Sequence, residues 1–261
     1  MDDAPTLRLV GGPTALISYG GVRLLTDPTF DEPRAYPRPG SDIVLRKLAG
    51  PSVELEDVMP VDAVLLSHDH HPDNLDNSGR EMLARAGKVL TTRAGAQRLG
   101  GNAVGMEPGD DVTLDRPDGG TAHVLAVAAE HGPPAVAAKN GPVIGFVLSG
   151  EQLPTVYVSG DNASVDVVRS IVAEHGPFDA VVLFIGGAQV PEAWGDAHLT
   201  LSAQLAVEAA RELGEAPIAP IHQHGWAHFS SSAADVEREF ASAGLSHRLL
   251  PLSPGQEIPL S

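Results

Sequence analysis

Residues 62–76 read Asp62-Ala-Val-Leu-Leu-Ser-His-Asp-His-His-Pro-Asp-Asn-Leu-Asp76, an apolar run that ends in a cluster of histidines and aspartates. The run at 63–66 is short, aliphatic and bounded by polar residues, which predicts a buried β-strand. His68 and His70 lie two residues apart, so they share one face if the extended geometry continues. Two imidazoles with carboxylates close behind can begin a metal site. A polar surface loop is the alternative, but it gives no reason to place ligand-type side chains at the mouth of a buried strand.

The composition is that of a soluble globular chain. Of the 261 residues, 43% are hydrophobic and 20% are charged, which allows a sizeable core and is too apolar for a disordered chain. We see no linker between two independent parts, so we expect one domain over residues 1–261. The chain has no Cys, which excludes disulfides and thiolate ligands. Any bound metal must therefore use nitrogen and oxygen donors.

The charge balance is strongly acidic, with 34 acidic and 17 basic residues and a formal net charge of -17. The basic residues are scattered, so the chain should repel nucleic acid and anionic membrane surfaces. The N-terminus lacks the basic start and apolar stretch of a signal peptide, and no apolar run approaches the ~20 residues of a membrane span. We therefore expect a cytoplasmic protein whose partner is a small-molecule substrate.

The pattern of apolar and polar residues predicts two strand-rich halves, each finishing in alternating strands and helices. The first half begins as an antiparallel meander, with a two-residue turn at Gly20-Gly21. Strands are expected at 6–10, 14–19, 22–26, 63–66, 89–92, 103–106, 111–114, 121–128, 143–149, 155–159, 180–185, 217–221 and 248–252, and helices at 77–86, 93–99, 165–174, 199–213 and 231–243. Helices outside two packed sheets are the simplest architecture for this pattern, an α/β sandwich.

Residues 28–60 are rich in proline and are expected to be irregular. A loop of this length inside a compact domain is uncommon and often functional, so it can form a pocket wall or a lid. The alternative is a surface excursion or a contact between copies in a homo-oligomer. The sequence leaves both open.

Polar residues of the kind that bind metals follow directly on the predicted strands. They are Asp27, His68, His70, Asp73, His131, Asp161 and His222. A single aspartate after a strand is more often a turn former. Such a series of nitrogen and oxygen donors instead favours one shared site, built on loops at one edge of a rigid sheet.

This ordered series resembles the metallo-β-lactamase fold superfamily of metal-dependent hydrolases, with the closest likeness to the branch that includes the ascorbate-6-phosphate lactonase type. The superfamily signature is His-x-His-x-Asp-His followed by isolated His, Asp and His at strand ends. The matching segments here are Thr26-Asp27-Pro28, His68-Asp-His-His-Pro-Asp-Asn-Leu-Asp76, His131, Gly160-Asp161 and Pro220-Ile-His222. The resemblance spans nearly the whole chain.

The resemblance implies a four-layer αββα sandwich that holds one or two ions, Zn or alternatively Mn or Fe, at one edge. Carried over residue by residue, His68, His70 and His131 match the ligands of the first metal, and Asp73 and His222 match ligands of the second. Asp161 matches the carboxylate that bridges both ions. Asp27 matches an aspartate behind the site.

The chain departs from the signature at its last histidine, where Asn74 stands instead. Aligning Asp73-Asn74 with the Asp-His pair requires one additional residue, His71 or Pro72; an ungapped alignment would instead place Asp73 at the last histidine. An amide oxygen is a poorer ligand for a transition metal than an imidazole. His71 could turn inward to compensate, but strand alternation predicts that it points away from His68 and His70, as a spacer or a residue behind the ligands. The same alternation predicts that Asp69 faces away from the site. Asp76 is expected to cap the helix that begins at residue 77.

The resemblance implies a hydrolase in which a bound cation lowers the pKa of its water toward ~7 and hydroxide attacks an ester, lactone or phosphodiester. Asp161 and Asp73 are expected to position the nucleophile, with Asp73 the better candidate to accept a proton if the second metal is absent. His228, in Gly225-Trp-Ala-His228-Phe, and His198 are the remaining histidines expected to reach substrate, although a packed structural histidine is the alternative for each.

Two other function classes compete with this interpretation. The chain has no Gly-x-Ser-x-Gly elbow and no Cys nucleophile, which argues against serine or cysteine hydrolases. The rival that remains is a fold relative that has lost catalysis and serves as a binding or scaffold protein. Asn74 is the residue that keeps this alternative open.

Overall fold

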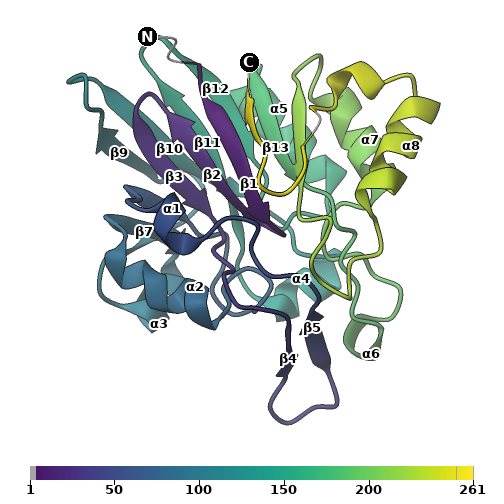
Figure 1. The fold of residues 1–261 in the computed structure, drawn as a ribbon. Helices are drawn as coiled ribbons and strands as arrows, with labels where there is room; N and C mark the ends of the chain where they lie inside the picture. The colour runs from purple at the N-terminus through teal and green to yellow at the C-terminus, as the bar shows by residue number, and fades with distance from the viewer. Residues whose placement is uncertain (1–3, 251, 261) are drawn as a thin grey trace.

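The computed structural model describes residues 4–250 and 252–260, and two β-sheets lie at its centre (Figure 1). The first sheet has seven strands in the order β15 (Glu257–Pro259), β1 (Thr6–Gly11), β2 (Thr14–Tyr19), β3 (Val22–Thr26), β6 (Ala63–Leu65), β7 (Lys88–Thr92) and β8 (Ala103–Met106). The second has six, in the order β14 (Ile218–Ile221), β13 (Ala180–Phe184), β12 (Leu153–Val158), β11 (Ile144–Gly150), β10 (Thr121–Ala128) and β9 (Asp111–Asp115). The predicted opening meander is confirmed, because β2 and β3 pair antiparallel across the Gly20-Gly21 turn.

Each sheet changes from antiparallel to parallel pairing along its width. Strands β3, β6, β7 and β8 pair in parallel in the first sheet, and β12, β13 and β14 do so in the second. The carboxyl ends of parallel strands meet at one edge of a sheet, and this is where loops can build a site. The predicted polar residues after β3, β6, β12 and β14 are therefore collected at one edge.

Helices cover the outer face of each sheet, so the order of layers is helix, sheet, sheet, helix (Figure 1). One core lies between the sheets, where side chains such as Ile17, Leu24 and Phe146 are buried. A second packs α5 (Val165–His175), α7 (Ala203–Glu212) and α8 (Ala233–Ser242) on the second sheet. A third involves α1 (Leu55–Val58), α2 (Asn77–Met82) and the short η1 (Leu83–Arg85), with α3 (Arg93–Leu99) beside them. The predicted αββα sandwich is confirmed.

A two-stranded hairpin formed by β4 (Arg34–Pro37) and β5 (Val44–Lys47) projects from the body of the molecule (Figure 1). Together with α1 it occupies the stretch 28–60, which the sequence predicted to be irregular. The two short helices α4 (Pro134–Asn140) and α6 (Pro191–Trp194) were also not predicted. Every helix that the structure describes falls short of the length and apolar character that a bilayer crossing demands.

The end of the chain differs from the prediction. No strand forms over the described part of 248–252: η2 (Ser246–Arg248) and a single bridge between Leu249 and Ile218 lie there, while residue 251 is outside the described residues. The cause is Arg248, whose buried guanidinium donates to the carbonyls of Ala216 and Ala210 and so ties the segment to the end of α7. The last strand is β15, which pairs antiparallel with β1.

The helix expected from residue 199 begins at Ala203. Ser202 is its N-cap and accepts the N–H of Leu205. The N–H groups of Leu199 and Leu201 donate to the carbonyls of Ala188 and Asn162, so this stretch runs extended beside the site instead of starting the helix.

Candidate metal centre

Loops at the shared sheet edge bring the predicted ligands together. His68 lies in the loop after β6, His131 between β10 and α4, Asp161 after β12 and His222 directly after β14. All four are buried, with at most 3% of their surface exposed. Asp27 and His222 adopt positive φ angles of 24° and 62°, so the chain turns sharply as each strand ends and the side chain is directed into the cluster.

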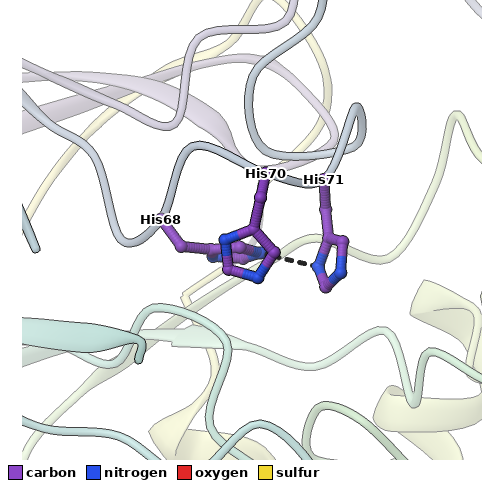
Figure 2. Close-up of side chains that lie close together, drawn as sticks. All are labelled: His68, His70 and His71. Atoms are coloured by element: carbon purple, nitrogen blue, oxygen red, sulfur yellow. Dashed lines mark hydrogen bonds between the residues drawn. The ribbon is translucent and has the colours of Figure 1, made fainter. Parts of the chain in front are cut away.

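Three histidines from the loop after β6 lie close together (Figure 2), and their ligand atoms are all within 4.8 Å of one another. The Nδ1 of His71 lies 2.9 Å from Nε2 of His68 and 3.2 Å from Nε2 of His131. The prediction that His71 points away from its neighbours is therefore wrong. The reason is a turn in the backbone, in which the His71 carbonyl accepts the N–H of Leu75 at 3.0 Å, so strand alternation has ended. His70 is the third member and lies at the rim of the cluster, with 25% of its side chain exposed.

A second group consists of Asp73, Asp161 and His222. The Oδ1 of Asp161 lies 3.7 Å from Nδ1 of His222, and the Oδ2 of Asp73 lies 3.8 Å from Nε2 of the same ring. Asp161 also belongs to a group with His68 and His131, and its Oδ2 lies 3.6 Å from Nδ1 of His131. The structure thus places Asp161 between two ligand groups, where the sequence predicted a bridging carboxylate.

Hydrogen bonds behind the cluster orient the side chains that compose it. Asp27 accepts from the backbone N–H of Ser67 at 2.6 Å and from its hydroxyl at 2.7 Å, and Ser67 Oγ lies 3.0 Å from Nδ1 of His68. Nδ1 of His131 donates to the Leu199 carbonyl at 2.8 Å. Such contacts fix the direction of an imidazole before a cation arrives. Asp27 thus lies behind the site, as predicted.

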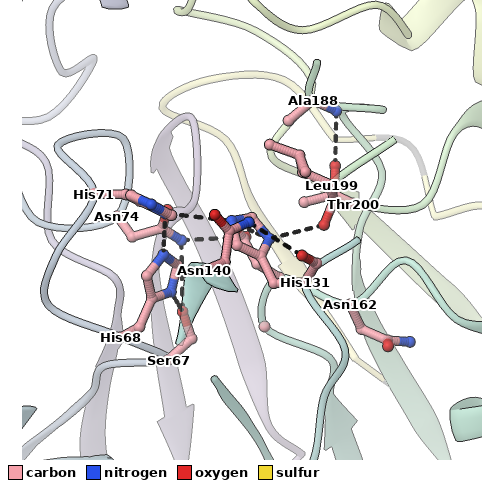
Figure 3. A network of polar contacts seen from close by, with 12 residues as sticks. Ser67, His68, His71, Asn74, His131, Asn140, Asn162, Ala188, Leu199 and Thr200 are labelled. Atoms are coloured by element: carbon pink, nitrogen blue, oxygen red, sulfur yellow. Dashed lines mark hydrogen bonds and ion pairs between the residues drawn. The ribbon is translucent and has the colours of Figure 1, made fainter. Parts of the chain in front are cut away.

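Asn74, which replaces the last histidine of the signature, lies near Ser67 and His68 (Figure 3). It binds two carboxylates instead of offering an imidazole. Its Nδ2 donates to Oδ2 of Asp27 at 3.0 Å and to Oδ1 of Asp161 at 3.1 Å. The side chain is buried, and no hydrogen-bond partner for its Oδ1 is found among the described residues. Asn74 therefore holds Asp161 in place between the two ligand groups.

We expect Asn74→Ala to weaken metal binding by about 10–100-fold, the range found when groups that orient metal ligands are removed. Competition with a coloured chelator measures the affinity. Asn77→Ala is the matched control, because Asn77 makes its amide hydrogen bond to Asp31 at 2.9 Å, in the cap region of α2. Equal affinity in the two variants would show that Asn74 does not position a ligand.

The electrostatics of the cluster favour a bound cation. Burial lowers the pKa of His131 to about 4 and that of His222 to about 3, so both imidazoles are neutral at physiological pH and have lone pairs to offer. Burial, with the nearby charges of Asp73 and Asp27, raises the pKa of Asp161 well above its ordinary value. Burying the carboxylates of Asp27, Asp73 and Asp161 together costs free energy unless a positive charge offsets theirs.

The donor atoms themselves fit a divalent ion of the transition series. Oδ2 of Asp161 and both ring nitrogens of His222 are buried without a hydrogen-bond partner in the described part of the chain. Buried polar atoms are normally paired, so these atoms require another partner. Imidazole and carboxylate donors with no thiolate are typical of Zn, Mn or Fe sites.

The remaining polar residues of the motif region have separate roles. Asp69 faces away and pairs with Arg98, as predicted. Asp76 is the N-cap of α2, also as predicted, and accepts the N–H of Gly79. His228 lies beside the cluster, with its Nε2 2.9 Å from Oδ2 of Asp73. The nearest hydrogen-bond partner of His198 is instead the Gly187 carbonyl, at 3.4 Å.

A cavity of about 420 Å³ opens on the cluster. Its floor contains His71, Asp73, His131 and His228, and His70 lies at its rim. Its walls are mainly apolar and come from the β4–β5 hairpin and the region of α6; they include Tyr36, Ile43, Leu45, Val190, Trp194 and Leu199. The stretch 28–60 thus contributes a wall of the cavity, one of the alternatives that the sequence left open.

Two cations also line the cavity, Arg38 and Lys139. Over the described ranges neither side chain makes an ion pair or a hydrogen bond to another side chain, and both residues are exposed. Among the described residues that line the cavity, Asp73 on the floor is the only one with a carboxylate. In a chain of net charge -17 this is a local region of positive charge.

Two facing sheets with helices outside, and buried histidine and aspartate clusters at their edge, define a protein of the metallo-β-lactamase fold. The comparison with protein families agrees, because the model of the beta-lactamase superfamily domain matches residues 22–223. The chain belongs to this superfamily.

Similar proteins are found in mycobacteria and among solved structures. An uncharacterized protein of Mycobacterium tuberculosis H37Rv is 30% identical over 263 residues, which cover 95% of this chain and 67% of the relative. The isothiocyanate hydrolase from Delia radicum gut bacteria has a TM-score of 0.81 at 21% identity, over 98% of this chain and 99% of that one. A possible metal-dependent hydrolase of Veillonella parvula has a TM-score of 0.83 at 16% identity, over 98% and 100% of the chains. These structural likenesses show the fold.

Proposed function

We propose that the chain is a metal-dependent hydrolase that cleaves an ester, lactone or phosphodiester bond of a small molecule. The observation that carries this proposal is the position of Asp161, which is shared by one ligand group containing His68 and His131 and another containing Asp73 and His222. One member of each group, His131 and Asp73, lines a cavity of about 420 Å³, a size suited to a small molecule. The ions are one or two of Zn, or alternatively Mn or Fe.

A divalent cation, when bound, supplies Lewis acidity that makes a water nucleophile available near neutral pH and polarises the bond to be cleaved. Residues of the chain itself accept and donate the proton. Burial would raise the pKa of Asp73, but its interactions with His228 and, less strongly, with His222 outweigh burial and keep that pKa well below its ordinary value. Asp73 is therefore ionised. The Asp73 carboxylate can accept the proton of the attacking water. His228, whose Nε2 donates to Oδ2 of Asp73 at 2.9 Å, can give its own Nε2 proton to the leaving group and then recover a proton from Asp73.

The cavity walls hold the substrate. Tyr36 and Trp194 offer aromatic surface to an apolar body and keep bulk water from the reacting bond. Arg38 and Lys139 favour a substrate that carries a negative group at its outer end. Small esters with a free carboxylate are the first compounds to test.

A second substrate class is an apolar isothiocyanate, the compound class in the name of one structurally similar protein. The mainly apolar wall of the cavity favours it. Its central carbon is electrophilic and would meet the same water nucleophile. An apolar isothiocyanate has no negative group for Arg38 and Lys139 to bind, which distinguishes it from an ester with a free carboxylate.

Protein purified without chelator should contain roughly one to two equivalents of transition metal and should hydrolyse at least one member of a panel. The panel comprises 4-nitrophenyl butyrate, a 4-nitrophenyl ester with a free carboxylate, a γ-lactone, bis(4-nitrophenyl) phosphate and phenethyl isothiocyanate. Stripping with dipicolinate should remove the activity and lower the unfolding midpoint, and adding Zn²⁺ should restore both. Metal at 100 times its Kd stabilises the folded state by about 2.7 kcal/mol.

Two outcomes would go against the proposal. Protein with no metal, and no stabilisation when metal is added, would contradict a metal site altogether. Metal binding with no turnover of any panel compound would favour the rival in which the fold serves as a binding or scaffold protein.

A further inference from the structure

We infer that the first metal site of this chain is formed by His68, His71 and His131, with His71 in the position that the family signature gives to His70. The inference rests on the proposed metal centre and specifies which side chains compose it. It concerns the histidine that the sequence pattern directed away from the site.

The distances between the ring nitrogens are those of ligands to one ion. Nδ1 of His71 lies 2.9 Å from Nε2 of His68 and 3.2 Å from Nε2 of His131. Nitrogens bound to a tetrahedral zinc at 2.0–2.1 Å lie about 3.3 Å from one another. Both of these contacts run from His71, and ligand atoms of His68 and His131 also lie within 4.8 Å of each other, so the three rings can meet at one ion.

The hydrogen bonds behind these rings assign their lone pairs. Nδ1 of His131 lies 2.8 Å from the Leu199 carbonyl, which can only accept, so this nitrogen carries the proton. The Ser67 hydroxyl donates to Asp27 at 2.7 Å, so it accepts from Nδ1 of His68 at 3.0 Å. In both rings Nε2 is left with a lone pair that faces His71. A shared cation is the partner that satisfies all three nitrogens.

The ligand atom of His70 also lies within 4.8 Å of those of His68 and His71, but His70 makes neither of the short nitrogen–nitrogen contacts. Its Nδ1 lies 3.9 Å from Oδ1 of Asp69, and within the described residues it makes no hydrogen bond to His68 or His131. Its ring approaches Gly141, where a Cβ added to the glycine would lie 3.8 Å from Cε1 of the imidazole. His70 therefore lies at the cavity rim, where it can meet substrate.

The sequence accounts for this exchange of histidines. His71 is three residues from His68, and the turn closed by its carbonyl brings its ring back over the cluster. The strand β6 has already ended at Leu65, and Pro72, which has no N–H to donate to a neighbouring strand, prevents its pattern from resuming. The extra residue in the signature thus supplies a ligand.

Cysteine substitution gives a positive test, because the natural chain has no Cys. His71→Cys and His70→Cys are purified, stripped of metal and titrated with cobalt(II). His71 presents Nδ1, the ring nitrogen nearer the backbone, so a thiolate at this position can take its place. We expect a thiolate-to-cobalt charge-transfer band in His71→Cys and none in His70→Cys.

An alanine pair provides the second measurement. His71→Ala should lose at least about 10-fold in affinity for the tighter cobalt equivalent, whereas His70→Ala should stay within about 3-fold of the natural protein. A band in His70→Cys, or equal or greater loss in His70→Ala, would overturn the inference. Natural protein that binds no cobalt would instead overturn the proposed function itself. Unfolding midpoints of the metal-free variants verify that each one is folded.

Discussion

Replacement of Asp161 by Asn should remove both metal equivalents and reduce hydrolysis by more than about 100-fold, beyond the loss typical of groups that only orient ligands. Among the described residues, Asp161 is the one ligand common to the group with His68 and His131 and the group with Asp73 and His222, so this substitution reaches both. Asn keeps the shape of the side chain but removes its charge and one acceptor oxygen. Its Oδ2, buried without a protein partner among the described residues, is the oxygen that we expect to bind the ion.

Metal content by elemental analysis and kcat on the panel substrate measure this effect. Asp111→Asn is the control, because it makes the same change in charge at an exposed aspartate that pairs with His123. His68→Ala should likewise lose metal and activity, since His68 belongs to the group shared with His131. Full metal content in Asp161→Asn would show that the carboxylate is not a ligand.

The second large effect concerns stability. Asp76 accepts from Nζ of Lys47 at 2.8 Å and from the backbone N–H groups of Gly79, Phe30 and Asp31 at 2.8, 3.0 and 2.7 Å. Its side chain is fully buried, and only 3% of the Lys47 side chain is exposed. Removing one partner of a buried ion pair leaves an uncompensated charge, so Asp76→Ala should lower the free energy of unfolding by about 3–5 kcal/mol.

Urea denaturation of metal-free protein measures this loss without the contribution of a bound ion. Arg85→Gln is the control, because it breaks an exposed pair with Glu56 that should contribute no more than about 1 kcal/mol. A loss below about 1 kcal/mol in Asp76→Ala would contradict this account. Lys47 ends β5, so Asp76 also ties the hairpin that walls the cavity to the loop that holds the histidines. The variant should therefore have a raised KM as well.

Much of the site could be predicted because its residues sit where strands end. Asp27, Asp161 and His222 each follow an apolar run that the sequence marks clearly, and regular parallel strands bring such ends to a common edge. Asp69 and Asp76 were also placed correctly, one facing away and one capping a helix.

His71 could not be placed from its periodicity. Alternation is a rule for extended backbone, and here a turn stabilised by the His71 carbonyl begins within the motif. Pro72 was a signal that the strand pattern had ended. The partners of His71 were beyond any local pattern, because His131 is 60 residues away along the chain.

The contacts of Asn74 and the position of the β4–β5 hairpin also depend on residues far away along the chain, so no local pattern predicted them. The sequence identified Asn74 as a poor substitute for a ligand, but its contacts with Asp27 and Asp161 come from two different sheets. The hairpin falls in a proline-rich stretch with no clear strand pattern, and contacts far along the chain position it, such as the bridge between Lys47 and Trp226.

The sequence by itself determined the αββα sandwich, the family and the series of donors at strand ends, because these depend on hydrophobic patterning and on the order of motifs along the chain. The tertiary structure decided which histidine turns inward, what Asn74 holds and which residues wall the cavity. These depend on where loops from separate strands meet, and a distance between two side chains far apart in sequence is set only when both sheets are packed.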